Sequence, residues 1–113
     1  MVLSFQNHGD DTRMIRDAIK AAQIESMKAG DKARLGTVRL MMAKIKDRDI
    51  ELRTTTNLPD DDLMVVEVLQ KMVKQRRDSA AQYANAGRNE LANVENAEID
   101  VIQQFLPSQL SEA

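Results

Sequence analysis

Residues 74–107, KQRRDSAAQYANAGRNELANVENAEIDVIQQFLP, decide how this chain folds. Apolar residues recur there at intervals of three and four, which is typical of helices with one buried side. Gly87 interrupts the pattern in the middle of the stretch, and Pro107 ends it. Glycine is the usual residue just beyond a helix C-terminus, and proline cannot continue a helix. We therefore predict two helices that form a long antiparallel hairpin turning at Gly87.

Two charged residues in this stretch lie where apolar side chains are expected. At about 100° per residue, Arg76 and Glu98 fall on the apolar sides of their helices. Each is eleven residues from Gly87, so an antiparallel hairpin brings them to the same level. We predict an ion pair between them, because a buried charge is tolerated when it is paired. The alternative is that the Arg76 stem follows the edge of the core and its guanidinium reaches water. The apolar stripes that define these sides are Leu69, Met72, Val73 and Ala80 before the turn, and Leu91, Val94, Ile102 and Phe105 after it.

The first part of the chain predicts two more helices. A first helix over roughly residues 11–29 ends at Gly30, and Asp31 then offers a side-chain oxygen to cap a second helix. This second helix begins near Lys32 and loses its apolar pattern near Arg48. The expected buried stripes are Ile15, Ala18, Ile19 and Ala22 on the first helix, and Leu35, Val38, Met42 and Ile45 on the second.

A polar loop that contains Pro59 separates these helices from the hairpin. Asp60, Asp61 and Asp62 follow, and negative charge is favoured at a helix N-terminus. We expect the third helix to run from these residues to about Ala86, and the fourth to begin near Asn89, a good capping residue. The sequence thus predicts an all-α, compact four-helix domain.

Composition limits the class of protein. The chain has 113 residues, enough for one domain with a modest core, and only 3% are aromatic. There is no cysteine and no apolar run long enough to cross a bilayer, so we predict a cytoplasmic protein that does not bind membranes. A net charge of -2 disfavours tight nucleic-acid binding through overall charge, but it allows a local basic patch. We expect residues 1–11 to form a flexible N-terminus.

Groups for catalysis or metal binding are scarce. The single histidine, His8, lies in the polar N-terminus, and without cysteine the usual zinc ligand sets cannot form. The run from Asp60 to Asp62 lacks the spacing and the glycine of a calcium loop, so a role at a helix N-terminus is the simpler interpretation. No serine has a histidine to activate it. We expect no catalytic residue, metal, cofactor or small-molecule substrate in this chain.

Basic residues cluster at three places and are the candidate RNA contacts. Lysine and arginine neutralise backbone phosphates and release counterions. The alternative is that these side chains form a solvated helix surface, because no aromatic residues are interleaved to stack bases. The candidates are Lys71, Lys74 and Arg77 on the third helix, Arg88 in the hairpin turn, and Lys44, Lys46 and Arg48 at the end of the second helix.

Two long blocks of the sequence resemble the YqeY family. They are GDKARLGTVRLMMAKIKDRDIE, residues 30–51, and VLQKMVKQRRDSAAQYANAGRNELANVENAEIDVIQQFLPSQLSE, residues 68–112. KQRR, AGR with a leucine three residues on, and FLPSQLSE are specific in combination. A domain of this family also forms the C-terminal tail of the B subunit of glutamine-dependent aspartyl/glutamyl-tRNA amidotransferase. The resemblance implies a helical N-terminal subdomain followed by a smaller helical subdomain.

The resemblance also implies a function outside the chemistry of the amidotransferase. In that enzyme the tail contacts the outer corner of the tRNA, whereas amide transfer and ammonia release occur in other domains. Residues 12–113 correspond to the N-terminal subdomain, and we expect the smaller subdomain, which contributes RNA contacts, to be absent from this sequence. A label of carbon-nitrogen ligase activity with glutamine as amido-N-donor would derive from the larger enzyme, and these residues alone could not perform it.

Two function classes stay open. The first is an accessory module that contacts tRNA through the basic residues. The second is a helical module for protein-protein interaction, which would dock through Ile24, Met27, Leu40 and Met41, because these apolar residues fall off the main stripes. They could equally be second buried sides of central helices. An enzyme comes third and would need a site supplied by a partner.

Overall fold

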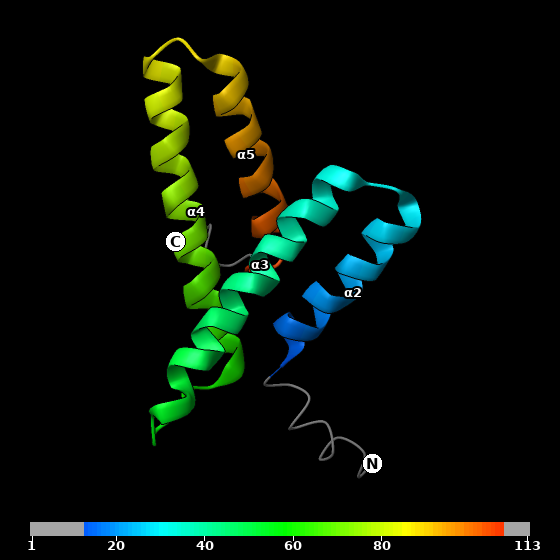
Figure 1. Ribbon diagram of the computed structural model, residues 1–113, viewed down its shortest axis with the longest axis vertical. Helices are drawn as coiled ribbons and strands as arrows, with labels where there is room; N and C mark the ends of the chain where they lie inside the picture. Colours follow the sequence, from blue (N-terminus) through cyan, green and yellow to red (C-terminus); the bar gives the residue numbers. More distant parts are fainter. Residues whose placement is uncertain (1–12, 108–113) are drawn as a thin grey trace.

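Two antiparallel helix pairs form the described part of the chain, residues 13–107, in a computed structural model (Figure 1). The first pair is α2, Met14–Ala29, and α3, Lys32–Glu51, which continues into the short 3₁₀ helix η1, Leu52–Thr54. The second pair is α4, Asp61–Asn85, and α5, Asn89–Gln103. Residues 13–107 contain no strand, so the predicted all-α fold of four helices is confirmed. The expected flexible N-terminus at 1–11, His8, and the sequence from 108 onward lie outside the described residues.

Glycine forms both hairpin turns. Gly30 and Gly87 have φ angles of 71° and 77°, a left-handed conformation that residues with a Cβ adopt at a cost. After α4, the backbone N–H of Arg88 donates to the Tyr83 carbonyl at 2.7 Å, and that of Gly87 donates to the Ala84 carbonyl at 3.0 Å. These bonds satisfy carbonyls that the end of the helix leaves without partners. The predicted turn at Gly87 is therefore present with its expected backbone geometry.

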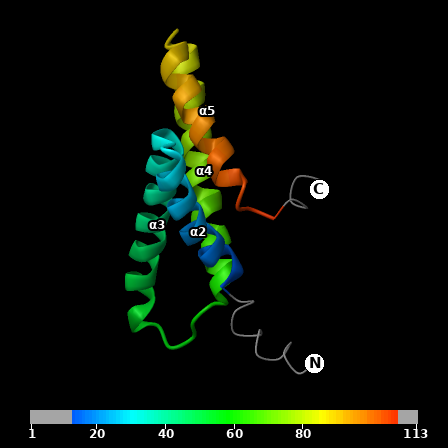
Figure 2. The same cartoon turned by 90° about the vertical axis from the view of Figure 1, so that its right-hand side faces the viewer.

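The core lies where the α2–α3 pair crosses the half of the α4–α5 hairpin that is remote from Gly87 (Figures 1 and 2). The hairpin tip projects beyond the first pair, and Ala80 and Ala92 are the last buried residues before the tip on α4 and α5. Aliphatic and methionine side chains supply the core, in keeping with an aromatic content of only 3%. Its buried members are Ile19, Ala22, Val38, Met41, Ile45, Met64, Val65, Leu69, Met72, Val73, Ile99 and Ile102.

The buried stripe of α5 differs from the predicted one. Leu91 and Val94 are exposed, Val94 to 53%, whereas Ala92 and Ile99 are buried together with Ile102. Near the tip, α4 is the only described helix beside α5, so just a narrow strip of α5 is covered (Figures 1 and 2). A small alanine fits this strip, and the larger side chains one and two positions away face water. The prediction for Leu91 and Val94 was therefore wrong.

Smaller differences affect the other helices. Ala18 is exposed and Ser26 is buried, because the inner side of α2 passes through Ala22 and reaches Ser26 one turn later. Met41, which falls off the predicted stripe of α3, is fully buried. Asn89 is the first residue of α5 and not its cap; Arg88 holds the cap position and makes no side-chain capping bond.

The three aspartates before α4 have separate partners. Asp60 accepts a hydrogen bond from the backbone of its own helix, the role predicted for a residue at a helix N-terminus. Asp62 Oδ1 accepts from the backbone N–H of Ile15 at 3.0 Å and so satisfies a donor in the first turn of α2. Asp61 accepts from the guanidinium of Arg16. This acidic run therefore joins the start of α4 to the start of α2.

The predicted ion pair across the hairpin is present. Arg76 Nε lies 2.9 Å from Glu98 Oε1, and the side chains are only 15% and 28% exposed. Arg76 Nη1 also donates to the Met72 carbonyl at 3.3 Å. The guanidinium is thus held inside the hairpin by two acceptors.

Arg34, in the first turn of α3, joins the two helix pairs. Its Nη1 donates to the buried Ser26 hydroxyl at 3.2 Å, and its Nη2 donates to Gln104 Oε1 at 3.0 Å. The guanidinium carbon also lies 5.9 Å from the centre of the Phe105 ring, within cation-π distance. One side chain of α3 therefore contacts α2 and the segment that follows α5.

Candidate functional site

The predicted basic residues lie on different sides of α3. Lys44 and Arg48 of α3 line a hollow of about 250 Å³ together with Lys71 of α4. Arg48, Lys71 and Lys74 line a neighbouring hollow of about 470 Å³. Two clusters that are separate in the sequence therefore meet on one surface. We call Lys44, Arg48, Lys71 and Lys74 the α3–α4 face.

Carboxylates are interspersed on the α3–α4 face. Arg48 Nη1 lies 2.8 Å from Glu51 Oε1, and Lys74 Nζ lies 3.3 Å from Asp78 Oδ2. The same hollows are lined by Glu67 and by Asp47. Exposed ion pairs such as these contribute little stability, but they reduce the positive potential of the surface. The α3–α4 face is therefore of mixed charge.

The remaining candidates on α4 and in the turn stand apart from these hollows. Arg77 is exposed one turn beyond Lys74 on α4, towards the hairpin tip. Arg88 is exposed at the tip, directly after Gly87. Neither contributes to the lining of the two hollows on the α3–α4 face.

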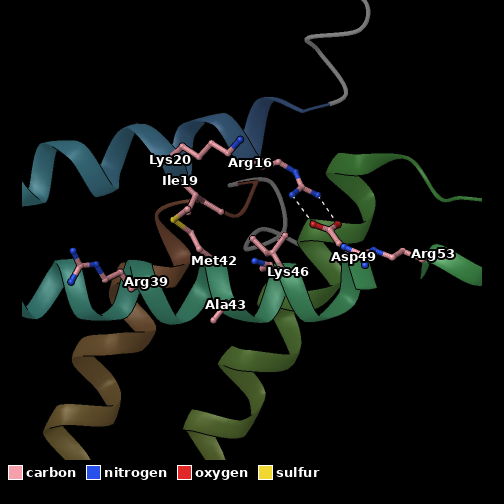
Figure 3. A pocket seen from close by; sticks show the side chains of 10 residues that line it. Arg16, Ile19, Lys20, Arg39, Met42, Ala43, Lys46, Asp49 and Arg53 are labelled. Carbon is pink, nitrogen blue, oxygen red and sulfur yellow. Dashed lines mark hydrogen bonds and ion pairs between the residues drawn. The ribbon is translucent and has the colours of Figure 1, made fainter. Parts of the chain in front are cut away.

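Lys46 lies in a different place, a groove of about 500 Å³ between α2 and α3 (Figure 3). Ile19 of α2 and Met42 of α3 point towards each other across its apolar floor. Lys20, Arg39, Lys46 and Arg53 are its exposed cations, and none of them makes an ion pair within residues 13–107. We call these four residues and the floor beneath them the basic groove.

Sequence reasoning missed three of the four cations in the basic groove. Arg39, Lys46 and Arg53 recur every seven residues, which is close to two helical turns, so they share one side of α3 and η1. That spacing was a usable signal. Lys20 could not have been added from the sequence, because its contribution depends on how α2 lies against α3.

Arg16 lines the basic groove (Figure 3) and binds two carboxylates. Its Nη1 and Nη2 each donate to one oxygen of Asp49 at 3.0 Å, and its Nε and Nη2 donate to Asp61 at 3.1 and 2.8 Å. These hydrogen bonds, first with Asp61 and then with Asp49, raise the pKa of Arg16 further above its ordinary value. Among residues 13–107, Asp49 is the one acidic residue that lines the groove, and Arg16 donates to both of its oxygens.

Comparison with known families identifies the chain. A family described as "Yqey-like protein" matches residues 15–113, which is most of the sequence. The chain belongs to this family. The match includes all of α3, α4 and α5, and hence the YqeY-like chain carries both basic surfaces within the family region.

Relatives of the YqeY-like chain occur in fungi. It is 31% identical over 84 aligned residues to "Altered inheritance of mitochondria protein 41, mitochondrial" of Vanderwaltozyma polyspora. The alignment covers 74% of this chain and 44% of the relative. The protein of the same name in Meyerozyma guilliermondii is 38% identical over 72 residues, covering 64% and 35%. An uncharacterized protein of Schizosaccharomyces pombe is 29% identical over 97 residues, covering 86% and 76%. The chain thus spans less than half the length of the first two relatives, whose names place those proteins in mitochondria; a cytoplasmic location for this chain stays a prediction.

The described part of the YqeY-like chain offers cations that can bind anions. Within residues 13–107, His, Asp and Glu side chains form no group of three that could hold a metal ion. Across the same range, no helix has the length and apolar character needed to cross a membrane. The guanidinium and ammonium groups of the basic groove and of the α3–α4 face can bind anions such as carboxylate and phosphate.

Proposed function

We propose that this YqeY-like chain is an accessory helical module that contacts tRNA, as its resemblance to the amidotransferase tail implies. One observation carries the proposal: exposed lysines and arginines from separate parts of the sequence gather around hollows on both sides of α3. Gathered cations attract a polyanion far more strongly than the same number of scattered ones.

The expected contacts are with the RNA backbone. Phosphate contacts position a protein on nucleic acid, whereas sequence is recognised through the bases. Among residues 13–107, no tryptophan, tyrosine or phenylalanine lines the basic groove or the α3–α4 face, so the described part of these surfaces offers no platform for stacking bases. In this role the module holds RNA for another protein, and any carbon-nitrogen ligase chemistry belongs to that partner.

Binding of bulk tRNA at two salt concentrations tests the proposal. We expect micromolar affinity at about 50 mM salt and a steep loss by about 200 mM, because each neutralised phosphate releases counterions. Replacement of Lys44, Lys46, Lys71 and Lys74 by alanine should weaken binding and flatten its salt dependence. A control variant, Lys28→Ala/Lys32→Ala, removes two exposed lysines beside the α2–α3 turn and should bind like the wild type. Failure of the wild type to bind at low salt would refute the proposal.

A second candidate function is protein-protein interaction through the outer side of α2. Ile24 and Met27 lie one turn apart and are 55% and 53% exposed, and Leu40 of α3 is also exposed. Met41 is no part of this surface, because it is buried. Sedimentation of the wild type and of Ile24→Glu/Met27→Glu tests whether the surface binds a second copy. Self-association that the variant lacks would favour this function, and a monomer at all concentrations would exclude a second copy as the partner.

A further inference from the structure

We infer that the basic groove is the main phosphate-binding site of this protein, and that it binds the backbone of double-helical RNA without reading its sequence. This inference rests on the proposed RNA contact and specifies its site and its substrate. The α3–α4 face, which contains most of the cations predicted from the sequence, has the lesser role.

Charge distinguishes the two surfaces. On the α3–α4 face, Arg48 and Lys74 are in ion pairs with nearby carboxylates, and further acidic residues line its hollows. In the basic groove, Lys20, Arg39, Lys46 and Arg53 make no ion pair within residues 13–107, and the single lining carboxylate is already bound by Arg16. The basic groove therefore keeps its positive potential, whereas nearby carboxylates reduce the positive potential of the α3–α4 face.

The spacing of the cations indicates an extended ligand. Arg39, Lys46 and Arg53 follow one another along α3 and η1 in Figure 3. Seven residues of helix rise about 10 Å, so the row is about 20 Å long. A single phosphate group forms hydrogen bonds over about 3 Å and cannot occupy the whole row. A polyanion with regularly repeated phosphates can contact all three cations at once.

The groove floor decides between single and double strands. Ile19, Met42, Ala43 and Ile45 form an aliphatic floor, to which the described part of the chain adds no aromatic ring. Proteins that hold single strands stack exposed bases on aromatic side chains, and this groove has none to offer. A double helix keeps its bases stacked internally and presents a rigid series of phosphates, which needs only cations. The geometry therefore fits duplex RNA better than a single strand.

Two triple variants on α3 and its surroundings test this assignment. Arg39→Ala/Lys46→Ala/Arg53→Ala removes the row in the basic groove, and Lys44→Ala/Lys71→Ala/Lys74→Ala removes the same number of charges from the α3–α4 face. All six side chains are exposed, so both variants should fold, which circular dichroism and a thermal melt verify. The ligands are bulk tRNA, a 20-base-pair RNA duplex of arbitrary sequence, and a 20-nucleotide oligouridylate.

We expect the groove variant to bind tRNA and the duplex at least tenfold more weakly than the wild type. Its slope of log affinity against log salt should fall by about one for each cation removed, or about three in all. The affinity of the face variant for tRNA and for the duplex should fall less than threefold. The wild type should bind oligouridylate more weakly than the duplex.

Other outcomes separate this inference from the proposed function. If the wild type fails to bind tRNA, the proposed function is refuted and the inference falls with it. If the wild type binds tRNA but the face variant loses as much affinity as the groove variant, or more, the inference alone is overturned. Equal binding of oligouridylate and duplex would overturn the assignment to double-helical RNA.

Discussion

Replacement of Arg76 by methionine should destabilise the protein by leaving Glu98 charged and without its partner inside the hairpin. Loss of one partner from a fully buried pair costs about 3–5 kcal/mol. Here the side chains are 15% and 28% exposed, so water retains some access to the remaining carboxylate. We therefore expect a loss of about 2–3 kcal/mol for Arg76→Met, and a similar loss for Glu98→Leu, which leaves the guanidinium unpaired.

The double variant distinguishes this mechanism from simple loss of contacts. Arg76→Met/Glu98→Leu replaces the whole pair by apolar side chains, which is often neutral or stabilising. We expect it to lie within about 1 kcal/mol of the wild type, and hence to be more stable than either single variant. Urea denaturation followed by far-UV circular dichroism gives all four free energies of unfolding.

Arg77→Met is the matched control for this cycle. Arg77 is the next residue along α4, is exposed, and makes no ion pair within residues 13–107. Its replacement should change the free energy of unfolding by less than about 0.5 kcal/mol. A coupling energy between Arg76 and Glu98 below about 0.5 kcal/mol would refute the reasoning, because the arginine would then be acting through its stem alone.

Five other substitutions test the fold by urea denaturation. Arg16→Met should cost about 2–3 kcal/mol, because it leaves two carboxylates facing each other without their shared cation; a change below about 0.5 kcal/mol would contradict this. At Gly87 and at Gly36 an added Cβ meets nothing within 4 Å, so the backbone conformation decides the effect of alanine. Gly87→Ala should cost about 1–2 kcal/mol because its φ is positive. Gly36→Ala within α3 should stabilise the protein by up to about 1 kcal/mol, because alanine favours a helix more than glycine does. Ile99→Ala should cost about 2–4 kcal/mol and Val94→Ala less than about 1 kcal/mol; the reverse order would restore the stripe predicted from the sequence.

The sequence predicted relations within the hairpin better than relations between the helix pairs. Arg76 and Glu98 meet although part of the stripe used to place Glu98 was wrong, because their equal distances from Gly87 fix the register by themselves. Leu91 and Val94 were misplaced because periodicity does not reveal how far the neighbouring pair extends along α5. Hydrophobic spacing identifies a helix and the turn that ends it. It does not show which part of that helix also packs against the other helix pair.

The candidate site was predicted only where local sequence patterns determine it, and not where it depends on how the helices pack together. Lys44, Arg48, Lys71 and Lys74 were found as charged clusters, and only the fold could show that they share a surface with carboxylates. The basic groove depends on α2 lying beside α3, which no local pattern encodes. By contrast, the row of cations formed by Arg39, Lys46 and Arg53 is visible in the sequence, because these residues are spaced seven apart.

Arg16 connects the stability of the fold to the charge of the basic groove. Asp49 is the one carboxylate that the described residues contribute to the groove lining, and it lies one turn from Lys46. Without a partner, its negative charge would repel a phosphate in the groove. Arg16 supplies that partner and at the same time ties α3 to Asp61 at the start of α4. Because hydrogen bonds with Asp61 and Asp49 raise its pKa above an already high value, Arg16 stays charged as pH rises, and the contribution of its charge is lost when pH passes through that raised pKa. The same side chain therefore holds three helices together and preserves the positive charge of the groove, on which the proposed phosphate binding depends.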